Sequence, residues 1–154
     1  MKHILIFFTA LTLGMTPLIG QNINPDYDST LAKKFGGDDY GMKYYVLVIL
    51  KTGTNDVQDK QKRDSLFAGH FENINRLADE GKLIVAGPIA KNDKNYRGIF
   101  ILDVTTFEEA SKMLQADPTI QENVFDVELY KWYGSAALAD YLPTHKKIEK
   151  FQIK

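Results

Sequence analysis

This chain of 154 residues lacks several of the residue types on which common functional sites depend. It contains no cysteine, which excludes disulfides, thiolate zinc sites, iron–sulfur clusters and a cysteine nucleophile. It contains three histidines, one of them His3, too few for a histidine-rich metal site. Its 19 basic and 20 acidic residues leave a net charge of −1. This balance gives no basis for binding nucleic acid or an anionic membrane.

The motifs of several enzyme classes are missing as well. Gly36 and Gly37 lack the preceding strand and the lysine of a phosphate-binding loop. The sequence contains no HExxH pair and no GxSxG nucleophile turn. We therefore expect neither a metal nor a cofactor. Hydrophobic residues make up 44% and charged residues 25% of the chain, which is typical of a globular domain and excludes wholesale disorder.

Residues 1–20 have the pattern of a secretory signal peptide. A short basic start precedes an uncharged apolar run over residues 4–13, and Pro17 and Gly20 follow. The run is shorter than the roughly 20 residues that span a bilayer, although an uncleaved membrane anchor is the alternative. We expect cleavage before Gln21 and an exported protein, periplasmic or extracellular, with no membrane contact after cleavage.

The rest of the chain divides into three parts. Residues 21–43 are polar and rich in glycine, which predicts an extended arm with one helical turn. Residues 44–134 carry the regular hydrophobic patterns of a folded domain. Residues 135–154 end in several lysines and are predicted to be a solvated C-terminal tail. A short helix that packs on the dimer is the alternative, and its apolar side chains are Leu138, Tyr141 and Leu142.

Hydrophobic periodicity predicts four strands and two helices in the central domain. The predicted strands are 44–50, 83–86, 98–104 and 125–132, and the predicted helices are 60–80 and 106–115. The order βαββαβ is that of a ferredoxin-like α+β fold. Right-handed crossovers place both helices on one face of a four-stranded antiparallel sheet.

The inner strands are apolar on both faces, and this predicts a second cover for the sheet. Along residues 44–50 (YYVLVIL) every position is apolar or aromatic, whereas a sheet with one wet face alternates apolar and polar residues. Two helices cover one face only. We therefore expect a homodimer that packs its open sheet faces together. The alternative is that the arm or the tail of the same chain covers that face.

One histidine and one aspartate are the candidate chemical groups. His70 lies on the apolar stripe of the first predicted helix of the domain, where an imidazole needs a partner or stays neutral. Asp117 precedes Pro118 at the end of the second, and a carboxylate beside His70 would set its tautomer and raise its basicity. The alternatives are a hydrogen-bonded core histidine and a turn aspartate.

The motifs around these residues resemble the YCII-related family. They are HFENINRLADEGKLIVAGPI from His70, GIFILDVTTFEEASKML from Gly98, ADP from Ala116 and VELYKWY from Val127. The resemblance implies a dimeric α+β barrel in which His70 and Asp117 form an acid–base pair. One branch of the family resembles enzymes that remove a halide from an aromatic ring, and the wider fold group includes muconolactone isomerases. The signal peptide, arm and tail depart from the short members of the family.

The residues leave three functions open. The first is a cofactor-independent lyase or isomerase in which His70 and Asp117 move a proton on a small cyclic or aromatic substrate. The second is a dimer that binds a small ligand without catalysis, and the third is a structural or interaction module. For the first two we expect a ligand cleft lined by Tyr45, Gly87 and Pro88.

Overall fold

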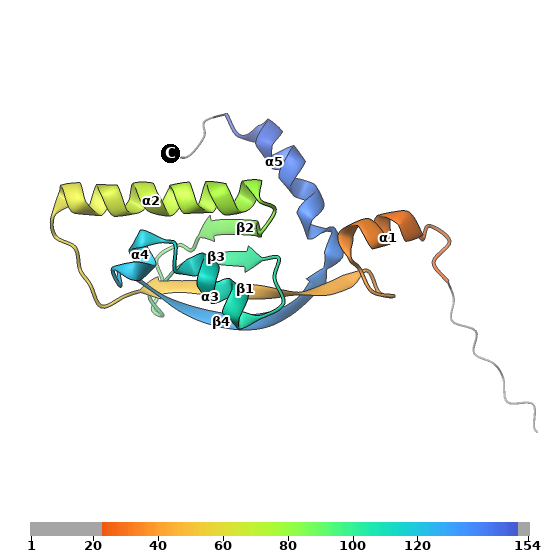
Figure 1. Cartoon of the computed structure of the whole chain (residues 1–154), viewed down its shortest axis with the longest axis horizontal. Coiled ribbons are helices and arrows are strands. Elements are labelled where there is room, and N and C mark those ends of the chain that lie inside the picture. Colours follow the sequence, from red (N-terminus) through yellow and green to blue (C-terminus); the bar gives the residue numbers. More distant parts are fainter. Residues whose placement is uncertain (1–22, 151–154) are drawn as a thin grey trace, which may run out of the picture.

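The structure is a computed structural model that describes residues 23–150, so the predicted signal peptide lies outside the described residues. The four strands form one sheet in the order β2-β3-β1-β4, and every neighbouring pair is antiparallel. The expected ferredoxin-like α+β fold is confirmed (Figure 1). The elements are α1 (Ser29–Phe35), β1 (Met42–Thr52), α2 (Lys60–Asp79), β2 (Leu83–Pro88), β3 (Tyr96–Leu102), α3 (Phe107–Leu114), α4 (Pro118–Gln121), β4 (Phe125–Ser135), the 3-10 helix η1 (Ala136–Tyr141) and α5 (Leu142–Ile148).

Side-chain caps and a glycine set the ends of the two main helices. Asp59 caps α2 by accepting a hydrogen bond from the backbone N–H of Lys62 at 2.6 Å. Gly81 follows α2 with φ +67°, a conformation that glycine adopts without strain. Thr106 caps α3 by accepting from the backbone N–H of Glu109 at 3.2 Å. Each such cap contributes about 1 kcal/mol, and the expected helix ends agree with the structure to one residue.

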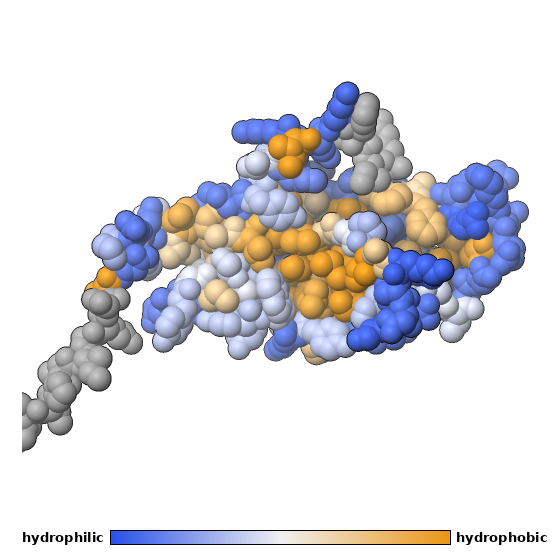
Figure 2. Space-filling view, turned by 180° about the vertical axis from the view of Figure 1, so that it is seen from behind, coloured by the Kyte–Doolittle hydropathy of each residue, from blue (hydrophilic) through white to orange (hydrophobic). Residues whose placement is uncertain are grey.

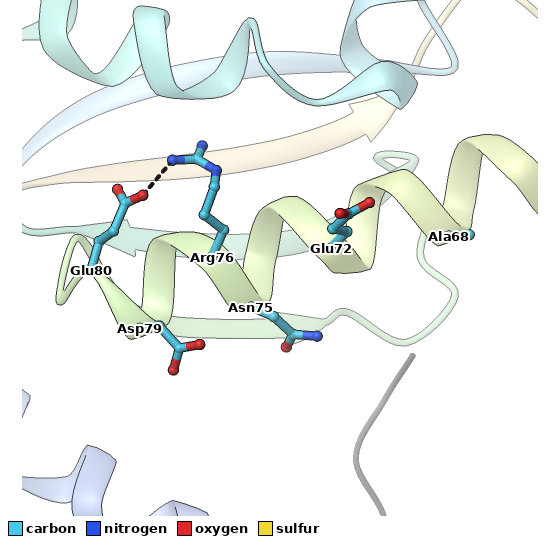
Figure 3. A pocket seen from close by; sticks show the side chains of 6 residues that line it. All are labelled: Ala68, Glu72, Asn75, Arg76, Asp79 and Glu80. Atoms are coloured by element: carbon cyan, nitrogen blue, oxygen red, sulfur yellow. Dashed lines mark hydrogen bonds and ion pairs between the residues drawn. The ribbon is translucent and has the colours of Figure 1, made fainter.

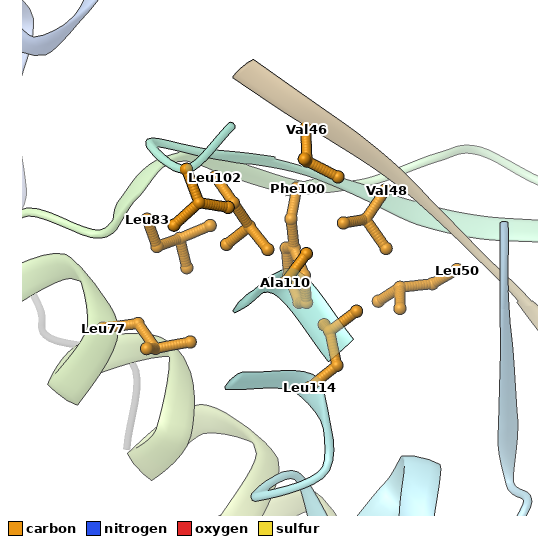
Figure 4. Close-up of a cluster of buried hydrophobic side chains, with 10 residues drawn as sticks. Val46, Val48, Leu50, Leu77, Leu83, Phe100, Leu102, Ala110 and Leu114 are labelled. Atoms are coloured by element: carbon orange, nitrogen blue, oxygen red, sulfur yellow. The ribbon is translucent and has the colours of Figure 1, made fainter. Parts of the chain in front are cut away.

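The main core lies between the sheet and the helices α2 and α3. Val46, Val48 and Leu50 point from β1 toward these helices, because side chains alternate along a strand. They meet Leu77 of α2, and the cluster is completed by Leu83, Phe100, Leu102, Val104, Ala110 and Leu114 (Figure 4). Burying a side chain of this size stabilises the fold by about 1.5–3 kcal/mol.

The C-terminal segment covers one end of the opposite sheet face, where a solvated tail was expected. Tyr45, Ile84 and Ile101 form a second buried cluster on that face. Leu138 and Leu142, from η1 and α5, pack against it. The hydroxyl of Tyr141 also donates to the carbonyl of Ile84. The physical reason is the apolar character of this stretch, which the sequence analysis noted only as the alternative.

The rest of that sheet face stays partly open. Leu47, Ile49 and Ile99 are half-buried, and Tyr130 is 49% exposed. Viewed from behind, the molecule shows hydrophobic side chains gathered in its centre below α5 (Figure 2). A second copy on this surface stays a prediction. The C-terminal segment therefore covers part of this face, as the alternative in the sequence analysis expected.

The arm contains a short capped helix at the edge of the domain. Asp28 caps α1 through the backbone N–H groups of Thr30 and Leu31. Gly36 ends it with φ +69°. Figure 1 shows α1 projecting from the end of the sheet near η1. No helix within residues 23–150 is long and apolar enough to cross a membrane.

Candidate functional site

The structure brings His70 and Asp117 into direct contact. Nδ1 of His70 lies 2.6 Å from Oδ2 of Asp117. His70 sits in the middle of α2, and Asp117 is the residue immediately before α4. The two residues are 6% and 0% exposed, respectively. A pair 47 positions apart in sequence therefore forms a buried hydrogen-bonded dyad between two helices.

Asp117 is held in place by its second role as the cap of α4. Its Oδ1 accepts hydrogen bonds from the backbone N–H of Thr119 at 3.0 Å and from the Thr119 hydroxyl at 2.6 Å. Pro118 occupies the first turn of α4, where its missing N–H costs nothing. These contacts occupy Oδ1 and turn Oδ2 toward His70. The carboxylate is thus oriented before any ligand binds.

A glycine permits the close approach of the two helices. A Cβ at position 69 would lie 2.6 Å from Cγ of Pro118, closer than real Cβ contacts allow. Gly69 precedes His70 on α2, and Pro118 follows Asp117. The contact between Gly69 and Pro118 therefore lies beside the dyad and sets the spacing of the elements that carry it.

The electrostatics of the dyad favour an ionised carboxylate. Burial raises the pKa of Asp117, but the hydrogen bonds from His70 and Thr119 outweigh burial and hold that pKa below its ordinary value. An ionised carboxylate only accepts hydrogen bonds, so Nδ1 of His70 carries the proton that it receives. In the neutral ring the basic lone pair then lies at Nε2.

The imidazole of His70 is surrounded by phenylalanine rings. The ring of Phe100 lies roughly parallel to it, with the centroids 6.0 Å apart. Phe67, Phe71 and Phe125 approach it with their rings tilted, at 6.1, 5.5 and 5.5 Å. Nε2 of His70 has no hydrogen-bond partner among the described residues, but this atom is not completely buried. It therefore keeps a small contact with solvent in a largely apolar setting.

Comparison with known proteins identifies the family. The YCII-related domain matches residues 42–133, more than half of the chain. The chain belongs to the YCII-related domain family. A search of curated proteins found no match. Among solved structures, the chain is similar to 5-chloro-2-hydroxyhydroquinone dehydrochlorinase from Burkholderia phenoliruptrix, in complex with 2,5-dihydroxybenzoquinone, at 20% identity and a TM-score of 0.40. The similarity covers 56% of this chain and 92% of that one.

Tyr45, which was expected to line the ligand cleft, does not lie beside the dyad. Tyr45 is fully buried on the sheet face away from α2 and α3, and its hydroxyl donates to the carbonyl of Ser135 at 2.9 Å. The expected shared cleft with His70 is therefore not formed in this chain. The reason is the side-chain alternation of β1, in which Tyr45 and Val46 point to opposite faces.

Gly87 and Pro88 lie at the end of the edge strand β2. They pair with Ile99 and Gly98 of β3. The preceding residue, Ala86, pairs with Phe100, whose ring stacks on His70. The two predicted ligand residues are therefore close to the strand positions beneath the dyad. A ligand role for them stays a prediction.

Two polar residues near the dyad were missed in the sequence analysis. Thr119 is fully buried and holds Asp117 with its hydroxyl and its backbone N–H. The available signal was Asp-Pro-Thr, because a helix cap bonds to a residue two positions on. Asn73 is also buried, one turn after His70 on α2. The signal for Asn73 was an amide within the apolar stripe of that helix.

Two surface hollows of the YCII-related domain lie away from the dyad. One, of about 650 Å³, follows the outer side of α2 and is lined by Ala68, Glu72, Asn75, Arg76, Asp79 and Glu80 (Figure 3). The other, of about 480 Å³, lies near the start of β1 and includes Lys43, Asp103 and Tyr133. Neither is lined by His70 or Asp117. Within residues 23–150 no group of three acidic or histidine side chains is placed to hold a metal ion.

Proposed function

We propose that this YCII-related protein is an enzyme that moves a proton on a small cyclic or aromatic substrate. The observation that supports the proposal best is the buried hydrogen bond between His70 Nδ1 and Asp117 Oδ2 at 2.6 Å. In this scheme His70 is the catalytic acid and base, acting through Nε2. Asp117 is a positioning residue, which fixes the tautomer of His70 and stabilises the positive ring after proton uptake.

The proposed chemistry needs only proton transfer. Nε2 of His70 takes a proton from a substrate hydroxyl or C–H group, and the electron pair of the broken bond moves into the substrate. In a lyase reaction a leaving group such as chloride departs with an electron pair, and the proton is later released to solvent. In an isomerase reaction His70 returns the proton to another position of the substrate. A positioned acid or base of this kind contributes roughly 10²–10⁴ in rate.

The proposal includes export and a homodimer. Export is proposed from the composition of residues 1–20. The dimer is proposed from Leu47, Ile49 and Ile99, which are apolar but only half-buried in the single chain. Sequencing the N-terminus of protein recovered from cell fractions tests export. Sedimentation velocity tests the dimer, and a stable monomer at micromolar concentration contradicts it.

Substitution of His70 tests the catalytic role. The full-length protein is assayed with chlorinated hydroquinones for chloride release and with muconolactone for isomerisation. His70→Gln keeps a polar side chain but removes the ring, and it should lower any turnover roughly 10²–10⁴-fold. His145→Gln is the matched control, because His145 is exposed on α5. Turnover by a folded His70→Gln protein at the native rate contradicts the proposal.

Ligand binding without catalysis is the second candidate function. The low exposure of His70 and the aromatic rings around it favour this candidate. In that case the dyad only hydrogen-bonds a bound molecule. A ligand that co-purifies with the native protein, is lost from His70→Gln and is never converted supports this second function over the first.

A further inference from the structure

A buried amide on α2 has a donor with no acceptor. Asn73 is 5% exposed, and within the described part of the chain its Nδ2 is the buried side-chain nitrogen without a hydrogen-bond partner. Leaving a buried donor unpaired costs about 1–3 kcal/mol. Native proteins satisfy most such groups, so an exception calls for a physical explanation. Asn73 lies in the row His70, Asn73, Leu77, which forms the buried side of α2.

The neighbouring arginine determines which way this amide faces. Nη2 of Arg76 donates to Oδ1 of Asn73 at 2.8 Å. A guanidinium has no acceptor, so the atom beside it must be the oxygen rather than the nitrogen. Arg76 lies one turn further along α2, and Figure 3 shows its side chain rising from the helix toward Glu80. Nδ2 is on the other side of the planar amide, away from Arg76.

We propose that Nδ2 of Asn73 donates a hydrogen bond to an oxygen of the substrate bound at His70. The inference rests on the proposed function and adds a binding residue to the same site. Residues three apart on a helix have Cβ atoms about 5–6 Å apart. A small ring that gives a proton to Nε2 of His70 would extend over that distance. A substrate oxygen then supplies the hydrogen-bond acceptor that Nδ2 of Asn73 lacks.

This assignment narrows the class of substrate. The substrate carries an acceptor oxygen, such as a carbonyl, phenolate or hydroxyl oxygen, about one ring width from the position that loses its proton. Nδ2 is an uncharged donor, so it stabilises negative charge that develops on that oxygen without itself changing protonation. A purely hydrocarbon or halocarbon ring lacks the acceptor and is excluded by this arrangement.

Stability without any ligand is the first test. Asn73→Leu replaces the amide by an apolar side chain of similar size, but it also removes the bond that Oδ1 accepts from Arg76. We therefore make it in an Arg76→Leu background, where that bond is absent from both proteins and removing the unpaired donor is neutral or stabilising. We expect an unfolding temperature equal to or above that of the Arg76→Leu protein. Glu72→Gln in the same background, on the exposed side of the same helix, is the matched control. A fall of several degrees on adding Asn73→Leu shows that the amide nitrogen has a structural partner and overturns the proposal.

Contact with an oxygen-bearing ring is the second test, with hydroquinone as the probe. The side-chain amide signals of Asn73 are followed by 15N NMR as the probe is added to the native protein and to His70→Gln. A downfield shift of these signals in both supports the proposal. If they do not move up to the solubility limit of the probe, the proposal is overturned. If His70→Gln turns over substrate at the native rate and the Asn73 shift is retained, the catalytic role of His70 is refuted but the contact at Asn73 is not.

Discussion

The substitution Asp117→Asn should change which ring nitrogen of His70 carries the proton. In the native protein Oδ2 of Asp117 accepts from Nδ1–H of His70, so the lone pair of the neutral ring is at Nε2. An asparagine still caps α4 through Oδ1, because Thr119 bonds to that oxygen twice. Its Nδ2 then faces His70 and donates to Nδ1. The ring proton moves to Nε2, and the variant histidine is no longer a base at that position.

The expected cost in stability follows from the bonds that change. A hydrogen bond to a charged group contributes about 1.5–3 kcal/mol and a neutral one about 0.5–1.5 kcal/mol. Asp117→Asn replaces the hydrogen bond between His70 and a charged carboxylate by one to a neutral amide, and it weakens the two bonds from Thr119. We expect the free energy of unfolding to fall by about 2–3 kcal/mol at pH 7. Asp117→Ala leaves the donors of His70 and Thr119 without an acceptor, and because each unpaired buried donor costs about 1–3 kcal/mol it should cost about 3–5 kcal/mol in total.

Two measurements check this reasoning. Long-range 1H–15N NMR correlations of the imidazole distinguish the two tautomers directly. We expect the proton at Nδ1 in the native protein and at Nε2 in Asp117→Asn. Thermal unfolding followed by circular dichroism gives the change in stability, with Asp93→Asn in an exposed loop as the control. If both proteins show the same tautomer, the assignment of Asp117 as the residue that orients His70 is wrong.

Three further predictions follow from the packing and the charges. Gly69→Ala places a Cβ about 2.6 Å from Pro118 and should destabilise the fold by about 1–3 kcal/mol in thermal unfolding. Gly87→Ala should not destabilise the fold, because no neighbouring atom lies within 4 Å of the added Cβ. The pKa of Asp117 is lowered in the fold, so its stabilisation is present above the unfolded pKa of about 3.9 and is lost as the pH falls through the folded pKa. Acid titration of Asp117→Asn should therefore show a shallower loss of stability, and an unchanged slope contradicts this. Ile49→Lys should abolish the proposed homodimer in sedimentation, and a dimer that persists places the interface elsewhere.

The parts of the fold that were predicted correctly are those that local chemistry decides. The run at 44–50 has no polar residue and gives β1, which extends two residues further at each end because β4 pairs along its whole length. The ends of α2 follow from Asp59 and Gly81, both readable from sequence. The contact between His70 and Asp117 was also expected, from the apolar stripe, the Asp-Pro step and the family resemblance together.

The parts that sequence did not decide depend on choices between tertiary alternatives. Polar and apolar residues alternate irregularly after β4, so the same stretch fits a solvated tail or the observed cover over Tyr45. The short helix α4 was not predicted, because four residues are too few for a periodic pattern. Sequence patterns also do not predict which atoms form hydrogen bonds with the amide of Asn73. An apolar stripe shows that the position is buried but not which atoms surround it.

The position of the dyad is determined by backbone features as much as by the two side chains. Asp117 has fixed orientation because one of its oxygens caps α4, and α4 exists at that point because Pro118 starts it. Gly69 then allows α2 to lie close enough for His70 to reach the other oxygen. A core histidine could be satisfied by any nearby backbone carbonyl, without an ionised partner. The hydrogen bonds from His70 and Thr119 more than offset the desolvation of the Asp117 carboxylate, which stays ionised. An ionised carboxylate differs from a carbonyl in one respect, because its full negative charge also stabilises the ring after His70 takes up a proton. That difference is the property which the proposed acid–base role requires.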